Sequence, residues 1–176
     1  MTEATKRYYA GIGSRETPHD VCLQMKDFAS ELSRQDFILR SGHSDGADIA
    51  FENGSCASKQ EIFLPWLGFN SNTLDTPASA QIILGHENQA KFEAIAQKHH
   101  GNWGICNPAA KKLLTRNVPV ILGLDLKTPV EFVISWSVGP GGTAHTTAIA
   151  QSYGIPVFNL AKPNGLKDLL DFAKTL

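Results

Sequence analysis

Three glycine-bearing turns, each placed directly after a short apolar run, constrain this chain more than any other feature. They lie at residues 11–15, 41–46 and 139–143 and are called here the first, second and third turns. Each precedes a segment with helical spacing, so each is expected where a strand passes into a helix. At such a turn glycine lets the backbone approach a ligand, and the helix N-terminus offers unpaired N–H groups to an anion.

Short apolar runs alternate along the chain with segments of helical periodicity. This alternation predicts an α/β fold, with one doubly wound, mostly parallel, Rossmann-like sheet covered by helices on both faces. Residues 66–85 are rich in Gly, Asn, Ser and Pro, so we expect an irregular excursion at about 66–117, with two helices near residues 92–99 and 110–114. The buried strands are expected at about 8–13, 37–39, 61–64, 132–136 and 156–160.

Composition narrows the class of protein. A chain of 176 residues fits one domain, which we expect to span residues 1–176. The net charge of −1 gives no global attraction to DNA, RNA or lipid, so we expect neither a nucleic acid nor a membrane as a partner. Three scattered cysteines lack the spacing of a zinc site or a disulfide framework, and the N-terminal apolar run is too short for a signal segment. We therefore expect a cytoplasmic protein without metal or cofactor.

The three turns, in this order, resemble those of the DprA/Smf proteins and the LOG nucleotide hydrolases, which together form the SLOG superfamily of Rossmann-like domains. The resemblance is greatest to small stand-alone DprA-like proteins of bacteriophages. It implies a pocket for a nucleotide-derived molecule above the carboxyl edge of the sheet. The matching residues are Gly13-Ser14-Arg15 in the first turn, Ser41-Gly42 with Gly46-Ala47-Asp48 in the second, and Gly141-Gly142-Thr143-Ala144 in the third.

The candidate ligand-binding residues lie in these turns and in one basic cluster. Phosphates are expected on the N–H groups of the first and third turns, helped by the Arg15 guanidinium. Asp45 and Asp48 either cap the second helix or accept hydrogen bonds from a ribose or base. Thr146 either reaches the ligand or bonds its own backbone. The full set is Gly13, Ser14, Arg15, Ser41, Gly42, Asp45, Gly46, Asp48, Arg116, Gly141, Gly142, Thr143 and Thr146.

Thr146 also bears on catalysis. In the LOG pattern a glutamate follows the Gly-Thr pair, and alignment on Gly142-Thr143 places Thr146 at that position. A hydroxyl cannot replace a carboxylate general base near neutral pH, so we expect binding without turnover.

The resulting hypothesis is a protein that holds a nucleotide-derived small molecule. In a phage this would suit sequestration of an immune signal such as a cyclic ADP-ribose derivative or a cyclic nucleotide. Two alternatives stay open. One is a LOG-like nucleotide N-glycosidase that uses Asp45, Asp48 or a histidine, and the other is a DprA-like recombination mediator that binds single-stranded DNA. A homo-oligomer, either a dimer or a tetramer, is expected.

Overall fold

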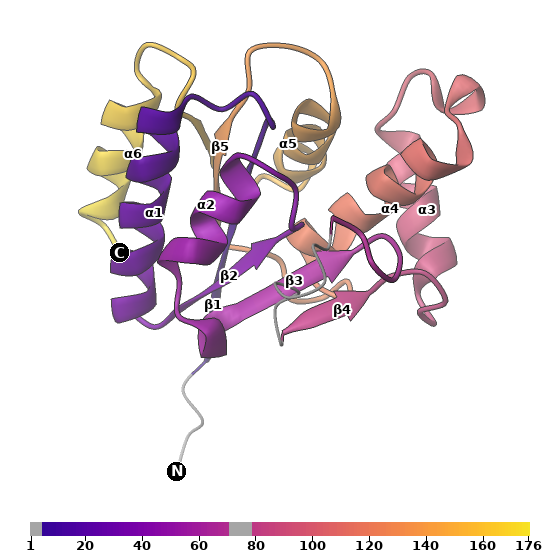
Figure 1. Cartoon of the computed structure of the whole chain (residues 1–176), viewed down its shortest axis with the longest axis horizontal. Coiled ribbons are helices and arrows are strands. Elements are labelled where there is room, and N and C mark those ends of the chain that lie inside the picture. The colour runs from indigo at the N-terminus through magenta and orange to yellow at the C-terminus, as the bar shows by residue number, and fades with distance from the viewer. Residues whose placement is uncertain (1–4, 71–78) are drawn as a thin grey trace.

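One parallel sheet runs through the centre of the computed structural model, which describes residues 5–70 and 79–176 (Figure 1). Within that part of the chain six strands lie in the order β4-β3-β2-β1-β5-β6, and all neighbours pair in parallel. The strands are β1 Arg7–Gly13, β2 Phe37–Ser41, β3 Gln60–Leu64, β4 Ala80–Ile82, β5 Phe132–Trp136 and β6 Val157–Asn159.

The strand order creates a switch point beside β1. The chain adds β2, β3 and β4 in succession on one side of β1, then returns to place β5 and β6 on the other side. Gly13, at the end of β1, is therefore in register with Trp136 at the end of β5. Open α/β sheets bind ligands in the crevice outside the carboxyl ends of two such strands. The topology alone thus points to the turns that follow β1 and β5.

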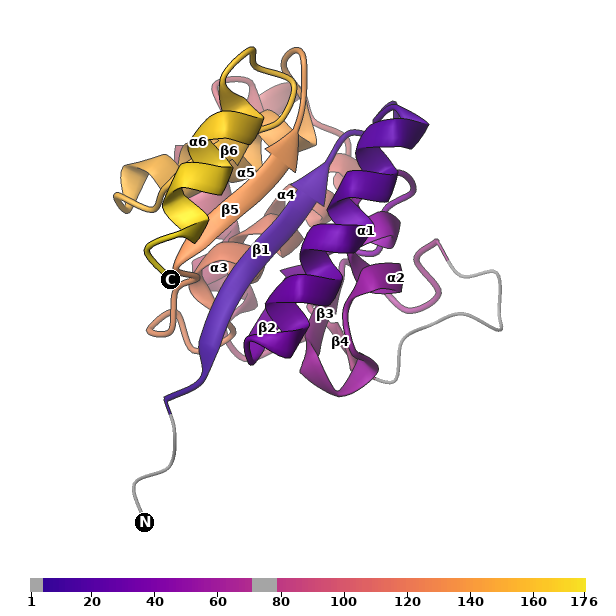
Figure 2. The ribbon, with the colours of Figure 1, turned by 90° about the vertical axis from the view of Figure 1, so that its left-hand side faces the viewer.

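Helices cover both faces of the sheet. The helices α1, α2 and α6 pack with one apolar cluster, and α3, α4 and α5 pack with a second cluster on the opposite face. Figure 2 shows α1 and α6 on the viewer's side of the sheet and α4 beyond it. Their bounds are α1 His19–Arg34, α2 Ala47–Gly54, α3 Gln89–Lys98, α4 Pro108–Leu122, α5 Gly142–Ser152 and α6 Gly165–Ala173, with short 3-10 helices η1 Ala57–Lys59 and η2 Trp103–Ile105.

Side-chain alternation along the strands divides the core between the two faces. Tyr9, Phe132 and Ile134 belong to the cluster under α1, α2 and α6, whereas Ala10 and Val133 belong to the other cluster. Because both faces are buried, each central strand is a near-continuous apolar run. This is why the strand runs are visible in the sequence.

The predicted α/β class and parallel sheet are confirmed. Both helices predicted within residues 66–117 are present as α3 and α4, so this region is more regular than expected. Its strand β4 has three residues, and residues 71–78 of the predicted excursion lie outside the described part of the chain. No helix in the described ranges is long and apolar enough to cross a membrane.

Phe132→Ala is expected to destabilise the fold by about 3–5 kcal/mol, since a buried phenylalanine leaves a cavity when truncated. Phe132 is fully buried, with ring centroids 5.8 Å from Tyr9 and 5.2 Å from Phe172. Urea unfolding would measure the loss. Tyr153, which is 53% exposed, gives the control, because Tyr153→Ala should change stability by less than about 0.5 kcal/mol. Equal effects of the two substitutions would contradict the packing described here.

Candidate functional site

The three turns meet around one cavity of about 460 Å³ at the switch point between β1 and β5. Its volume falls in the range typical of small-molecule sites. One face of α4 closes it opposite the turns. The lining residues are Ile12, Gly13, Ser14, Arg15, Gly42, Ser44, Asp48, Leu113, Leu114, Arg116, Asn117, Val120, Ser137, Val138, Gly139, Pro140, Gly141, Gly142, Thr143, Ala144 and Thr146.

The first turn does not offer the row of free amides that the sequence predicts. The Gly13 amide donates to Asp48 Oδ1 at 3.2 Å, and the Ser14 amide donates to Trp136 O at 3.0 Å. The Ser14 hydroxyl accepts a hydrogen bond from the amide two residues further on. The prediction of a phosphate on these N–H groups is therefore corrected, because internal bonds occupy them. What the turn offers is the exposed Arg15 guanidinium, which has no hydrogen bond or ion pair within the described residues.

The third turn is open. Gly141 caps α5 with φ at 143°, a left-handed conformation that favours glycine, and α5 begins at Gly142. Within residues 5–70 and 79–176 the amides of residues 141–144 have no protein acceptor. A Cβ atom added at Gly142 would meet nothing within 4 Å. These amides and the α5 dipole together form a site suited to an anion.

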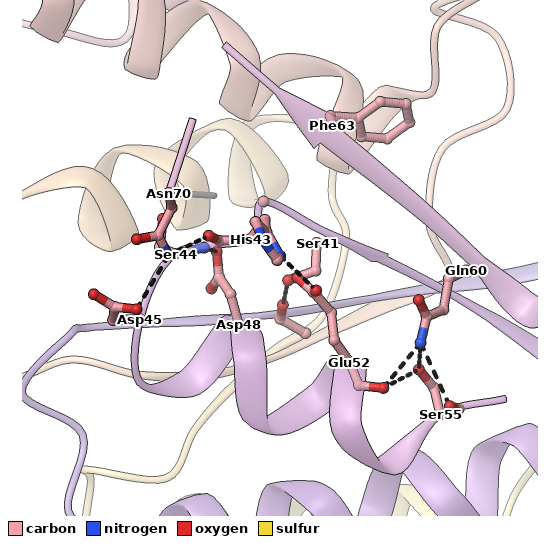
Figure 3. A network of polar contacts seen from close by, with 12 residues as sticks. Ser41, His43, Ser44, Asp45, Asp48, Glu52, Ser55, Gln60, Phe63 and Asn70 are labelled. Carbon is pink, nitrogen blue, oxygen red and sulfur yellow. Dashed lines mark hydrogen bonds and ion pairs between the residues drawn. The ribbon is translucent and has the colours of Figure 1, made fainter. Parts of the chain in front are cut away.

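Asp48 connects the first and second turns. Its carboxylate accepts from the Gly13 amide through Oδ1 and from the Ser44 amide at 3.3 Å through Oδ2. Figure 3 shows its side chain rising from α2 toward the second turn. The residue is 5% exposed, and this burial raises the pKa of Asp48 to about 6, while the positive charge of Arg116 opposes the rise.

Arg116 is buried beneath the second turn and does not act as an exposed phosphate clamp. Its Nη1 donates to Gly42 O and, at 3.1 Å, to Phe63 O, at the carboxyl ends of β2 and β3. The guanidinium also lies over the Phe69 ring, with Cζ 5.3 Å from the centroid. A Cβ on Gly42 would collide with this guanidinium, so the glycine at that position makes room for Arg116. Arg116 therefore fixes the second turn to α4.

Asn117 plays the corresponding part for the third turn, and sequence reasoning missed it. Its Nδ2 donates to Gly142 O at 3.4 Å and lies 3.5 Å from His145 Nδ1. His145 Nε2 donates to Ala96 O at 2.9 Å, and burial lowers the pKa of His145. Residues 113, 116, 117 and 120 have the spacing of one face of α4. This spacing places Asn117 on the same face as Arg116 and is the sequence signal that could have identified it.

A buried hydrogen bond between His43 and Glu52 lies under the second turn. His43 Nδ1 is 2.7 Å from Glu52 Oε2, and this hydrogen bond raises the pKa of His43 (Figure 3). His43 has φ at 59°, and Asn70 Nδ2 donates to its carbonyl at 2.8 Å. His43 and His145 are both buried and hydrogen-bonded.

Three predicted site residues lie outside the cavity. Ser41 is fully buried and donates to Gly11 O at 2.7 Å, so its hydroxyl stabilises the sheet edge. Asp45 is exposed beside the cavity and accepts from Asn70 Nδ2. Gly46 has φ at 83° and packs closely against the Ser14–Arg15 backbone. These three residues shape the turns without lining the cavity.

The structure brings the other ten predicted residues to the cavity wall. Thr146 is among them, but its hydroxyl donates to Gly142 O at 2.9 Å and so bonds its own helix. Thr143 is the second residue of α5, and Gly141 occupies the N-cap position of this helix. The polar lining residues that sequence reasoning missed are Ser44, Asn117 and Ser137.

Comparison with known proteins yields a structural likeness. The sequence matches no protein-family model, and no curated protein matches it either. Among solved structures, it is similar to DNA processing protein A from Helicobacter pylori, described for its unique single-stranded DNA binding mode. The TM-score is 0.61 at 18% identity, over 96% of this chain and 74% of that chain. The two proteins share the Rossmann-like, DprA-like fold.

This likeness corrects one prediction. Nucleic acid was excluded as a partner from the net charge of −1, yet a protein of the same fold is described as binding single-stranded DNA. Net charge measures the whole surface, whereas binding depends on the charges at one site, and here the cavity wall carries the exposed Arg15 guanidinium. The exclusion of nucleic acid therefore does not hold.

Asp48→Asn is expected to change how stability depends on pH. Because the folded pKa of Asp48 exceeds its usual 3.8, the folded chain holds more protons than the unfolded chain between about pH 4 and pH 6. Its contribution is thus fully present below pH 4 and is lost as pH rises through 6, by up to about 3 kcal/mol. Urea unfolding at pH 5 and pH 7.5 should show the wild type gaining stability relative to Asp48→Asn at the lower pH.

The matched control is Asp45→Asn, which removes an exposed carboxylate three residues away. Its stability difference from the wild type should be nearly the same at both pH values. A pH-independent difference for Asp48→Asn as well would show that Asp48 is not a strained, buried carboxylate.

Proposed function

We propose that this chain binds single-stranded DNA by holding one phosphate on the open N-terminus of α5 with the help of Arg15. The observation that carries the proposal is the row of amides at residues 141–144, which have no acceptor in the described part of the chain and face a cavity at the switch point of the sheet. Hydrogen bonds to a charged group contribute about 1.5–3 kcal/mol each, so a few of them give useful affinity. The likeness to a DNA-binding protein of the same fold supports this proposal.

Local charge supports the same proposal. Among residues 5–70 and 79–176 the exposed Arg15 guanidinium has no acidic partner, and the buried positive charge of Arg116 lies beneath the second turn. Asp48 is the acidic lining residue of the cavity, and its two carboxylate oxygens already accept backbone amides. A phosphate at the N-terminus of α5 can therefore accept hydrogen bonds from the amides of residues 141–144 and from the Arg15 guanidinium.

The hydrogen bonding of Thr146 supports the proposal of binding without turnover. Its hydroxyl is bonded to Gly142 O, and the hydroxyl is no base at neutral pH, so the LOG route of N-glycosidic hydrolysis has no carboxylate at that position. Asp48, the alternative carboxylate considered for this role, is engaged in holding two turns. We therefore propose binding, and not nucleotide hydrolysis, as the function of this site.

A nucleotide-derived small molecule is the second candidate ligand. The observation in its favour is the concave form and volume of the cavity, about 460 Å³, which suits a ligand of about one nucleotide. Both candidates present a phosphate to the third turn. They differ in whether the bound nucleotide continues into a strand.

Gly142→Val and Arg15→Gln should each weaken binding of a fluorescent oligothymidylate by at least tenfold, measured by anisotropy at fixed salt. Valine at Gly142 projects into open space, so it blocks the amides without a clash inside the fold. Removing Arg15 should also lower the slope of log affinity against log salt by about 0.7, the value for one phosphate on a single strand.

The matched controls are Gly101→Val and Arg34→Gln. Gly101 likewise has open space for a Cβ, and Arg34 is an exposed arginine at the end of α1, outside the cavity. Both controls should bind like the wild type. If Gly142→Val retains full affinity while remaining folded, the third turn is not the binding site and the proposal fails.

A further inference from the structure

We propose that a second, smaller cavity on the far side of α4 is a further nucleotide subsite, so that the ligand is a strand of several nucleotides. This inference rests on the proposed function and extends it. The cavity has a volume of about 200 Å³ and lies beyond the carboxyl ends of β3 and β4. Nothing in the three glycine turns contributes to it.

The second cavity combines an apolar wall with basic side chains. Pro65, Ile83, Leu84 and Pro108 supply apolar surface, and Leu84 is 44% exposed, which is high for a leucine. Lys111 and Lys112 come from α4, together with Thr115. An apolar surface bordered by ammonium groups suits a nucleobase with its neighbouring phosphates.

The two cavities use opposite faces of one helix. Residues 108, 111, 112 and 115 of α4 line the second cavity, whereas residues 113, 114, 116, 117 and 120 line the first. The second-cavity residues follow the i, i+3, i+4, i+7 spacing of a single face, and the first-cavity residues follow the same spacing with Leu114 added. A helix with its side chains is about 10 Å across, so a ligand that occupies both cavities must pass over α4. One nucleotide cannot do so, but consecutive nucleotides of a strand can.

The N-terminal end of α4 provides a passable route between the cavities. Residues 107–109 are exposed there, and α4 is 15 residues long, so the positive end of its dipole lies along the route. Lys112 is exposed on the same end of the helix. A phosphate that crosses α4 at this end thus meets favourable charge.

The acidic lining residue of the second cavity is Glu93 on α3. It comes from α3, whereas the two lysines come from α4, and its carboxylate can accept a hydrogen bond from an amino group of a base. Lys111 Nζ also lies 5.6 Å from the centroid of the Trp103 ring, which orients it without neutralising its charge. The second cavity therefore keeps a net positive charge from two lysines against one glutamate.

A length series tests the inference. Affinities of thymidine 5′-monophosphate and of oligothymidylates of two, four and eight nucleotides would be measured for the wild type and for the double variant Lys111→Gln/Lys112→Gln. We expect the double variant to bind the eight-nucleotide strand at least fivefold more weakly, with the salt slope reduced by about 1.4 for two phosphates. Binding of the monophosphate, which reaches only the first cavity, should stay unchanged.

The control is Lys26→Gln/Lys127→Gln, which removes the same charge from residues that line neither cavity. If both double variants weaken the long strand equally, the effect is one of overall charge and the second subsite is refuted. The same conclusion follows if the wild type binds the monophosphate and the eight-nucleotide strand with equal affinity. The proposed function fails separately, when Arg15→Gln and Gly142→Val leave binding of both probes intact.

Discussion

The Asp48 carboxylate is the interaction on which the carboxyl edge of the sheet depends. It accepts a hydrogen bond from the Gly13 amide of the first turn and one from the Ser44 amide of the second, so two segments 31 residues apart in sequence keep a fixed separation. Burial of an ionised carboxylate is unfavourable unless such donors compensate it. Arg116 and Asn117 continue the chain of contacts to the third turn, and the cavity is the space that these three side chains hold open.

The sequence predicted the architecture well because its signals are local. Each glycine follows an apolar run, and the apolar runs alternate with segments of helical spacing. Both patterns depend on neighbouring residues alone. The predicted convergence of the three turns is also found in the structure. Which amides stay free could not be predicted in this way. The Gly13 amide is occupied by Asp48 and the Ser14 amide by Trp136, through contacts that only the folded chain creates.

Arg116 shows the same limit for side chains. A basic residue beside Lys111 and Lys112 has the pattern of a solvated helix face, yet the guanidinium is buried against two carbonyl groups. The distinction depends on Gly42, 74 residues earlier, which leaves room for it. Net charge was misleading for a related reason, since paired acidic and basic residues elsewhere cancel in the total but do not act at the cavity.

The open space above Gly142 has a practical consequence. No atom of the described residues lies within 4 Å of a Cβ at this position, so substitutions at Gly142 should leave the fold intact. The same substitutions should weaken binding. A cysteine introduced at this position would carry a fluorophore directly over the α5 amides. Such a labelled chain would report occupancy of the cavity by any anion, whatever its identity.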